Sequence, residues 1–174
     1  MVARTYSATL IGVNATEVEI ESFEGGGTPK ILIVGLPDAA VKESRERVAA
    51  AILSSGFRFN DGVTTVNLAP ADLKKEGPGF DLPIAISLLA HHARLPDHAL
   101  PTSAMIGELA LNGELRPVRG ILAIALEARA RGRQRLLVPR RCAVEASVVE
   151  GIDIIGVANL QEAMMYLKGD LDIP

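Results

Sequence analysis

The chain has 174 residues, of which 48% are hydrophobic and 22% charged, values typical of one ordinary globular domain. No apolar run approaches the roughly 18 residues of a membrane span, and the composition also excludes disordered and collagen-like chains. The single cysteine, Cys142, excludes an internal disulfide and a Cys-rich zinc site. The first residues lack a secretory signal, so we expect a cytoplasmic protein that does not engage a membrane.

The formal net charge of -3 conceals an uneven distribution. Residues 116–141 hold eight arginines and one acid, Glu127, whereas the rest of the chain holds ten basic residues against twenty acids. The basic segment therefore carries +7 and the remainder -10. Aromatic residues make up only 3% of the chain, which argues against a stacking platform for single-stranded nucleic acid.

The chain begins with a pattern of strands. Residues 5–10 and 16–22 are predicted strands, and the second alternates apolar residues with glutamates, as a half-buried antiparallel strand does. Residues 31–34 are a short β-branched run that predicts a buried strand. A helix is expected to follow over residues 38–55, because apolar residues recur there at helical spacing.

This helix has a clear start and end in the sequence. Asp38 is expected to cap its first turn, and Gly56 stands where a left-handed residue ends a helix. The polar face is expected to lie in solvent, with a Glu-to-Arg pair four residues apart. Its members are Lys42, Glu43, Glu46 and Arg47.

A second strand and helix flank a long loop. Residues 63–68 predict a strand, residues 69–80 a loop rich in Pro, Gly and Lys, and residues 81–91 a helix. Asp81 is expected to cap this helix at its N-terminus. An alternative is that the loop and the free N–H groups of the helix start hold an anion. We favour the structural interpretation, because the Asp81 carboxylate would compete with an anion for the same N–H groups.

The clearest local signal is the dipeptide Asn112-Gly113. It lies between residues 103–111 and 114–118, both of which read as strands. Asn-Gly accepts positive φ at both turn positions, so the sequence predicts a hairpin with a type I′ turn.

The last third of the chain alternates helices and strands. A helix over residues 121–131 is expected to end at Gly132. Two strands and two helices then follow in alternation, at residues 136–138, 143–149, 152–155 and 160–167. The chain is therefore predicted to be a single domain of mixed α/β or α+β class, with antiparallel hairpins and helices packed on a sheet.

Several chemistries lack their motifs. No phosphate-binding loop of the Walker type and no dinucleotide-binding glycine motif occurs, and the Gly-rich residues 25–30 contain a proline where N–H groups would be needed. The three histidines, His91, His92 and His98, do not have the spacing of a metal site. We therefore expect no metal and no cofactor in this chain.

Four long motifs carry a resemblance to a known family. Taken in order, they look like the N-terminal domain of the magnesium-chelatase-related AAA+ ATPases of the ComM/YifB type, over residues 6–167. The motifs are GLPDAAVKESRER (35–47), NLAPADLKKEG (67–77), FDLPIA (80–85) and GELALNGELRPVRG (107–120). The resemblance implies an ATPase module downstream, binding ATP and Mg²⁺, in a hexameric ring that works in DNA branch migration.

The same domain is similar to the proteolytic domain of Lon proteases. The Lon serine stands in Gly-Pro-Ser-Ala-Gly, and the matching residues 77–81 place Gly79 at that position. The Lon lysine stands in Gly-Gly-Leu-Lys, and the matching residues 119–122 place Leu122 there. The resemblance therefore implies a Lon-like fold without the catalytic dyad, because neither glycine nor leucine can act as a nucleophile or a base.

A second function class stays open at this point. A Lon-type serine peptidase with a relocated dyad would have to use Ser87 together with Lys74 or Lys75. A small-molecule phosphotransferase would need a glycine-rich phosphate loop, for which residues 77–81 are the only candidate.

The arginine series is the remaining candidate site. Guanidinium groups bind phosphates, so the series predicts contact with the backbone of DNA rather than with its bases. The alternatives are a ring interface or a solvated surface. The residues are Arg116, Arg119, Arg129, Arg131, Arg133, Arg135, Arg140 and Arg141.

Overall fold

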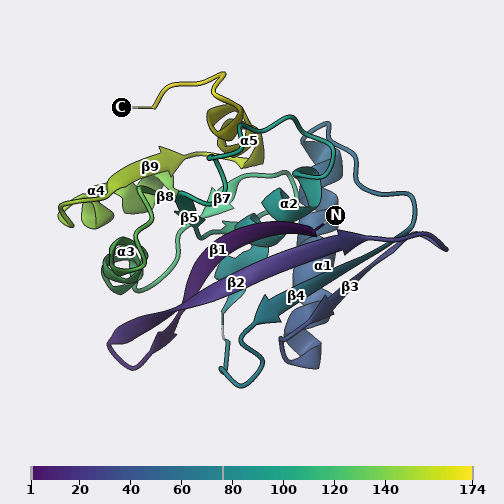
Figure 1. The fold of residues 1–174 in the computed structure, drawn as a ribbon, viewed down its shortest axis with the longest axis horizontal. Coiled ribbons are helices and arrows are strands. Elements are labelled where there is room, and N and C mark those ends of the chain that lie inside the picture. Colours follow the sequence, from purple (N-terminus) through teal and green to yellow (C-terminus); the bar gives the residue numbers. More distant parts are fainter. Residues whose placement is uncertain (1, 76, 174) are drawn as a thin grey trace.

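The structure is a computed structural model that describes residues 2–75 and 77–173 (Figure 1). Met1, Pro174 and Glu76, the last of which belongs to the second motif above, lie outside the described residues. The described residues form mixed sheets with helices packed on them, which confirms the predicted mixed α+β class. Within this part of the chain, no helix is long and apolar enough to cross a membrane.

The largest sheet has four strands in the order β1-β2-β4-β3. Neighbouring strands are antiparallel except β3 and β4, which are parallel. This confirms the predicted N-terminal strands, which are longer than expected because β1 and β2 pair along nearly their whole length. Their bounds are β1 Val2–Ile11, β2 Asn14–Glu24, β3 Lys30–Val34 and β4 Val63–Ala69.

A second sheet is fully parallel, in the order β5-β8-β9. It consists of β5 Ser103–Met105, β8 Arg135–Pro139 and β9 Asp153–Val157. The prediction of one strand over residues 103–111 is therefore wrong. The chain leaves this sheet after Ile106, and Gly107 donates a hydrogen bond to Gly79 instead.

The predicted hairpin forms, but it is short and its turn is not type I′. Strands β6 Glu108–Leu109 and β7 Leu115–Arg116 pair antiparallel. In the turn, Gly113 alone has a positive φ, of 92°, and its N–H donates to the Ala110 carbonyl at 2.9 Å. The Asn112 side chain accepts a hydrogen bond from the Glu114 N–H at 3.0 Å. This is a longer loop with a left-handed glycine, one of the other common hairpin connections.

Helices α1 and α2 cover one face of the large sheet, and α3 packs against the end of its β1–β2 hairpin. In Figure 1, the β1–β2 hairpin crosses the front of the molecule with α1 and α2 behind it, and α3 lies beside its lower end. The helices are α1 Asp38–Ser54, α2 Asp81–Leu89, α3 Ile121–Ala130, α4 Ala143–Ala146 and α5 Leu160–Lys168, with short 3-10 turns η1 Pro78–Phe80 and η2 Arg140–Cys142. Helix α4 is shorter than the predicted 143–149.

Asp38 does not cap α1, contrary to the prediction. Asp38 is already the first helical residue, so Pro37 occupies the capping position and no side chain makes a capping hydrogen bond. Asp38 lies inside the first turn, where its charge can only interact with the helix dipole. The end of the helix is as predicted, with Gly56 at a φ of 84°.

Two apolar clusters form the core. The larger one lies between the four-stranded sheet and helices α1, α2 and α5, and the smaller one gathers around α3, α4 and the parallel sheet. Every residue of α2 is buried, so this helix runs through the middle of the molecule. Just before α2, Phe80 belongs to the larger cluster and Gly79 lies against Ile106 of the smaller one.

Candidate functional site

A hollow of about 500 Å³, called here the Gly79 hollow, opens beside Gly79, the residue that the resemblance to Lon proteases places at the serine position. Its wall comes from the end of β1, the loop before α2, and the segment between β7 and α3. Leu10, Ile106 and Val118 give it an apolar character, and Glu108 and Arg119 are its charged lining residues.

The Ile106 side chain occupies the space that a side chain at residue 79 would need. A Cβ atom there would lie 2.8 Å from Ile106 Cγ1 and 3.0 Å from Ile106 Cδ1, which is closer than carbon atoms pack. Gly79 itself is buried. A serine at this position would therefore have to displace Ile106 from the smaller core cluster.

The lysine position is equally unsuited to catalysis. Leu122 lies in the first turn of α3 and is partly exposed. Since it carries no titratable group, nothing at this position could deprotonate a nucleophile. The two positions that the resemblance to Lon proteases assigns to the dyad are therefore a buried glycine and a leucine.

Ser87 is not placed to replace the missing nucleophile. It is fully buried in α2, and its hydroxyl donates a hydrogen bond to the Ile84 carbonyl at 2.7 Å. Lys75 is also buried, with its Nζ donating to the Leu73 carbonyl at 2.8 Å, and burial lowers its pKa. None of Ser87, Lys74 and Lys75 lines the Gly79 hollow. The serine that a relocated dyad would need is therefore enclosed in the core of this structure.

Asp81 is structural, but it is not an N-cap as predicted. It is the first residue of α2, and its buried carboxylate accepts hydrogen bonds from three residues of two other elements. Arg47 Nε donates at 2.6 Å, Ser44 Oγ at 2.8 Å and the Leu109 N–H at 3.0 Å. The carboxylate thus ties α1 and β6 to the start of α2.

Burial and hydrogen bonding act on Asp81 in opposite directions. Burial raises the pKa of its carboxyl, while the bonds from Arg47, Leu109 and Ser44 counteract that rise. The hydrogen bond to Asp81 raises the pKa of Arg47, which stays charged. The prediction that Arg47 lies on a solvated face is therefore wrong, although its pair with Glu43 forms at 3.8 Å.

Two of the histidines contact the C-terminal end of β2. His91 Nε2 lies 2.9 Å from Ser22 Oγ, and His92 Nε2 lies 2.6 Å from Glu24 Oε2. Across residues 2–75 and 77–173, no three His, Cys, Asp or Glu side chains gather as metal ligands would.

Three of the eight arginines of the series, all near the start of β8, are bonded within the fold. Arg133 pairs with Glu17 at 2.9 Å, donates to the Pro101 carbonyl and covers the Tyr6 ring at 3.6 Å. Arg131 pairs with Glu127 at 2.9 Å. Arg129 donates to the Glu150 carbonyl at 2.8 Å. The Arg133 contacts join the segment before β8 to β1 and β2. The bonds of Arg129 and Arg131 lie at the exposed end of α3.

Two further arginines have weaker internal contacts. Arg135 lies over the Tyr166 ring at 5.9 Å, near the outer limit of a cation–π contact. Arg140 pairs with Glu162 at 2.9 Å from an exposed position. Such surface pairs contribute little to stability.

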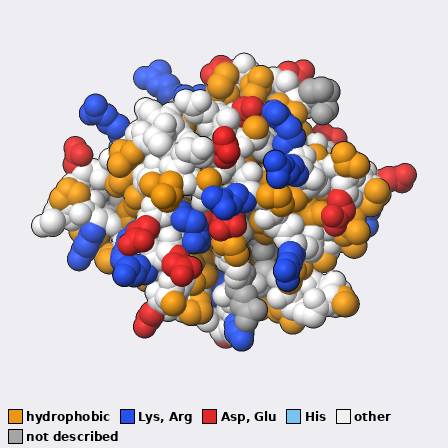
Figure 2. Space-filling model, turned by 180° about the vertical axis from the view of Figure 1, so that it is seen from behind, with side chains coloured by type: hydrophobic (Ala, Val, Ile, Leu, Met, Phe, Trp, Pro, Cys, Tyr) orange, Lys and Arg blue, Asp and Glu red, His pale blue; other side chains and the backbone are white. Residues whose placement is uncertain are grey.

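The remaining three arginines are Arg116, Arg119 and Arg141, called here the arginine strip. All three are exposed, and none has a hydrogen bond or ion pair with a described residue. Arg116 and Arg141 line a hollow of about 440 Å³, and Arg119 lines the Gly79 hollow. Pro117 lines both hollows, so the strip runs along one surface. Figure 2 shows positive and negative side chains interspersed on the far face of the molecule, so an anion would meet local clusters of charge rather than a uniform field.

A comparison with protein families identifies the relationship. Residues 17–142, well over half of the chain, match the family described as subunit ChlI of Mg-chelatase. The chain belongs to the ChlI family. The matched range contains Gly79, Asp81 and Leu122 and all of the arginine strip, whereas β9 and α5 lie beyond it.

Individual relatives agree with this assignment to the ChlI family. The chain is 40% identical to the uncharacterized protein YifB of Escherichia coli over 94% of its own length and 32% of the relative. It is 38% identical to the competence protein ComM of Haemophilus influenzae over 99% of its length and 34% of the relative. It is 30% identical to the DNA repair protein RadA of Mycobacterium tuberculosis over 82% of its length and 28% of the relative. The chain thus spans about a third of the length of these relatives.

Proposed function

We propose that this chain is a non-catalytic, Lon-like N-terminal module of a longer magnesium-chelatase-like AAA+ ATPase that acts on DNA. The observation that carries this proposal is the backbone at Gly79, where a Cβ would lie 2.8 Å from Ile106 Cγ1. Because a core side chain fills the space that a nucleophile at residue 79 would need, the domain is suited to binding or assembly rather than to cleavage.

The DNA-related part of the proposal draws support from two sources. Two relatives are named for competence and for DNA repair, and both processes handle DNA. The arginine strip supplies three exposed guanidinium groups that no described residue neutralises. In the proposed whole protein, ATP and Mg²⁺ bind to the ATPase module, copies assemble into a hexameric ring, and the ring drives branch migration during recombination and natural transformation.

The first experiment tests the absence of peptidase chemistry. We expect a fluorophosphonate serine probe to leave the chain unlabelled and peptide substrates uncut. The variant Gly79→Ser/Leu122→Lys restores both dyad residue types and should still be inactive, because the serine cannot take its place without displacing Ile106. Stoichiometric labelling of the natural chain, at Ser87 or elsewhere, would overturn the proposal.

The second experiment tests DNA contact. Fluorescence anisotropy at low salt should show weak binding of duplex and forked DNA by this chain. If three phosphates meet the arginine strip, the log–log dependence of affinity on salt should have a slope of about -3, since each duplex phosphate contributes about -0.9. Complete absence of binding to duplex, forked and single-stranded DNA would leave the arginine strip as a ring interface or a solvated surface.

A further inference from the structure

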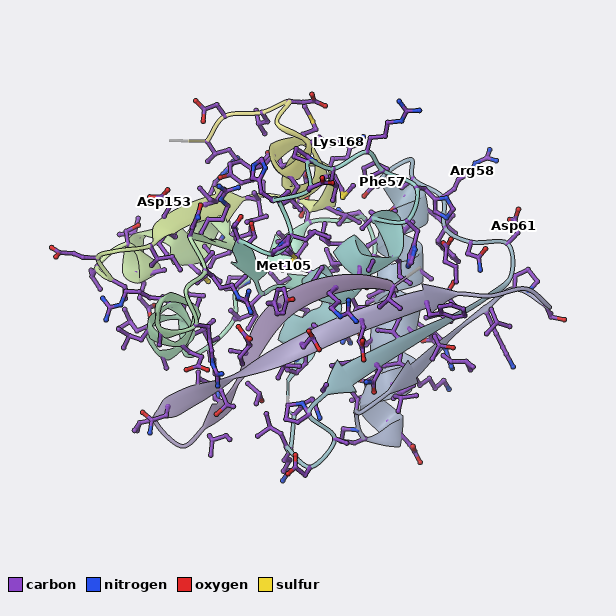
Figure 3. The ribbon with its side chains drawn as sticks, in the orientation of Figure 1. Phe57, Arg58, Asp61, Met105, Asp153 and Lys168 are labelled. Atoms are coloured by element: carbon purple, nitrogen blue, oxygen red, sulfur yellow. The ribbon has the colours of Figure 1, made fainter. Side chains whose placement is uncertain are left out.

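A separate hollow of about 410 Å³, called here the Phe57 hollow, lies away from the Gly79 hollow. The loop between α1 and β4, the end of α2 and the helix α5 form its walls. Figure 3 shows Phe57, Arg58 and Lys168 on the same shoulder of the molecule, with the Arg58 side chain extending outward. No residue of the arginine series lines this hollow.

The lining combines an apolar floor with a charged rim. Leu89 and Met164 are buried at the floor, and the half-buried rings of Phe57 and Phe59 line the wall. Phe57 and Phe59 are two of the four phenylalanines of the chain, and they stand on either side of Arg58 in one loop. This loop supplies the aromatic surface that the low aromatic content of the chain argued against.

Two cations at the rim are free to meet an anionic ligand. Arg58 and Lys168 are exposed and have no hydrogen bond or ion pair with any described residue. His92 also lines the hollow but is bound to Glu24, and Asp61 is the acid at the rim. The hollow therefore offers aromatic surface and unpaired positive charge side by side.

The loop that carries the phenylalanines is fixed by its own hydrogen bonds. The Asn60 side chain donates to the Gly25 carbonyl at 2.9 Å, and the Phe57 N–H donates to the Ile52 carbonyl at 3.0 Å. Gly62 packs so closely on Gly26 that a Cβ there would lie 2.9 Å from Gly26 Cα. The site is thus formed before any ligand arrives, which lowers the entropic cost of binding.

We propose that the Phe57 hollow binds one nucleotide of a single-stranded nucleic acid. The base packs against Phe57 and Phe59, and the flanking phosphates meet Arg58 and Lys168. Aromatic surface beside a cationic backbone track is how single strands are bound without sequence preference. A purely apolar ligand would leave both cations without a role, and a free anion would make no use of the rings. The inference is independent of the arginine strip and of the ATPase proposal.

The test compares two fluorescent 15-mers of equal charge, oligothymidine and an abasic strand of the same length. We expect this chain to bind oligothymidine at least about fivefold more tightly, because stacking is lost in the abasic strand. The variant Phe59→Leu keeps apolar bulk in the wall and should reduce that preference toward one. If the natural chain binds both strands equally, or neither, the proposal is wrong.

Charge variants provide the matched control. Arg58→Ala/Lys168→Ala should weaken oligothymidine binding about tenfold at low salt, whereas Lys42→Ala/Arg45→Ala, with the same loss of charge on α1, should weaken it far less. Asp61→Asn should strengthen binding, a result that a merely structural role would not give. Equal losses of oligothymidine affinity in the two double variants would contradict the proposal. It would also be contradicted if an acidic peptide displaced oligothymidine and its own binding depended on Arg58, Phe59 and Lys168 in the same way. Arg116→Ala/Arg141→Ala should leave the oligothymidine preference unchanged, which separates this inference from the proposed function.

Discussion

Charged side chains occupy two contrasting kinds of region in this molecule. Asp81 and Arg133 are bonded to several partners inside the fold, whereas Arg116, Arg119 and Arg141 are exposed without a partner among the described residues. Both kinds contain arginines from one continuous basic segment. The comparison teaches that the number of charges in a segment does not give the number available to a ligand, because the fold neutralises some of them internally.

The partners that separate the two regions come from distant parts of the chain. Arg133 pairs with Glu17, 116 residues away, and Arg47 reaches Asp81 across 34 residues. An acid near the N-terminus, Glu17 of β2, thus neutralises one charge of the basic segment. Once Arg133, Arg131 and Arg129 are bonded, the positive charge that remains lies toward β7 and η2.

The largest expected effect is at Asp81. Asp81→Ala should lower the free energy of unfolding by about 3–5 kcal/mol, because it leaves Arg47 without its buried partner and removes the acceptor for the Leu109 N–H. Chemical denaturation measures the loss. Asp38→Ala is the control and should cost less than about 0.5 kcal/mol, since Asp38 makes no capping bond. Similar losses in the two variants would show that Asp81 is only a helix-terminal acid.

A smaller effect is expected at Arg133. Arg133→Ala should destabilise the fold by about 2 kcal/mol, since it removes the pair with Glu17, the bond to Pro101 and the contact over Tyr6. Thermal unfolding followed by circular dichroism measures this change. If the variant is as stable as the natural chain, the contacts of Arg133 do not stabilise the fold, and the distinction between bonded and exposed arginines is wrong.

Arg131 should fall near the boundary between the two regions. Its bond joins an exposed guanidinium just after α3 to the partly buried Glu127 four residues earlier, and helical pairs of this spacing contribute about 0.3–0.5 kcal/mol. Arg131→Ala should therefore change the unfolding midpoint only slightly, and that change should disappear in high salt. If Arg131→Ala loses as much stability as Arg133→Ala, at low and at high salt, then the bond of Arg131 stabilises the fold as much as the contacts of Arg133 do.

Much of the fold could be predicted from local sequence, and the exceptions have physical causes. The alternation in β1 and β2 and the stops at Gly56 and Gly132 depend on neighbouring residues, and the structure confirms them. Asp81 reads as an N-cap because a local pattern cannot reveal that Arg47 and Leu109 will lie beside it. The turn at Asn112 differs because Asn can also accept a backbone N–H with its side chain, and here it does.

The candidate sites divide in the same way. The loss of the dyad could be predicted, because the resemblance gives the identity of residues 79 and 122. The sequence could not show which three of the eight arginines lack a partner, because that depends on ion pairs between distant elements. The Phe57 hollow has a partial local signal, because Phe57, Arg58 and Phe59 are consecutive. Its second cation, Lys168, and its floor come from α5 and α2, which a local pattern cannot reveal.

The most direct test of the account is the salt dependence of duplex DNA binding by two matched variants of this chain. Arg116→Ala/Arg141→Ala removes two charges of the arginine strip, and Arg129→Ala/Arg131→Ala removes two bonded charges from the same basic segment. The account predicts that the first variant keeps its stability, loses affinity for all duplex sequences alike and has a log–log slope smaller by about two. It predicts that the second variant keeps the slope of the natural chain. Equal slopes and affinities in both variants would contradict the central claim that, within residues 116–141, the arginine strip is the part that meets duplex DNA.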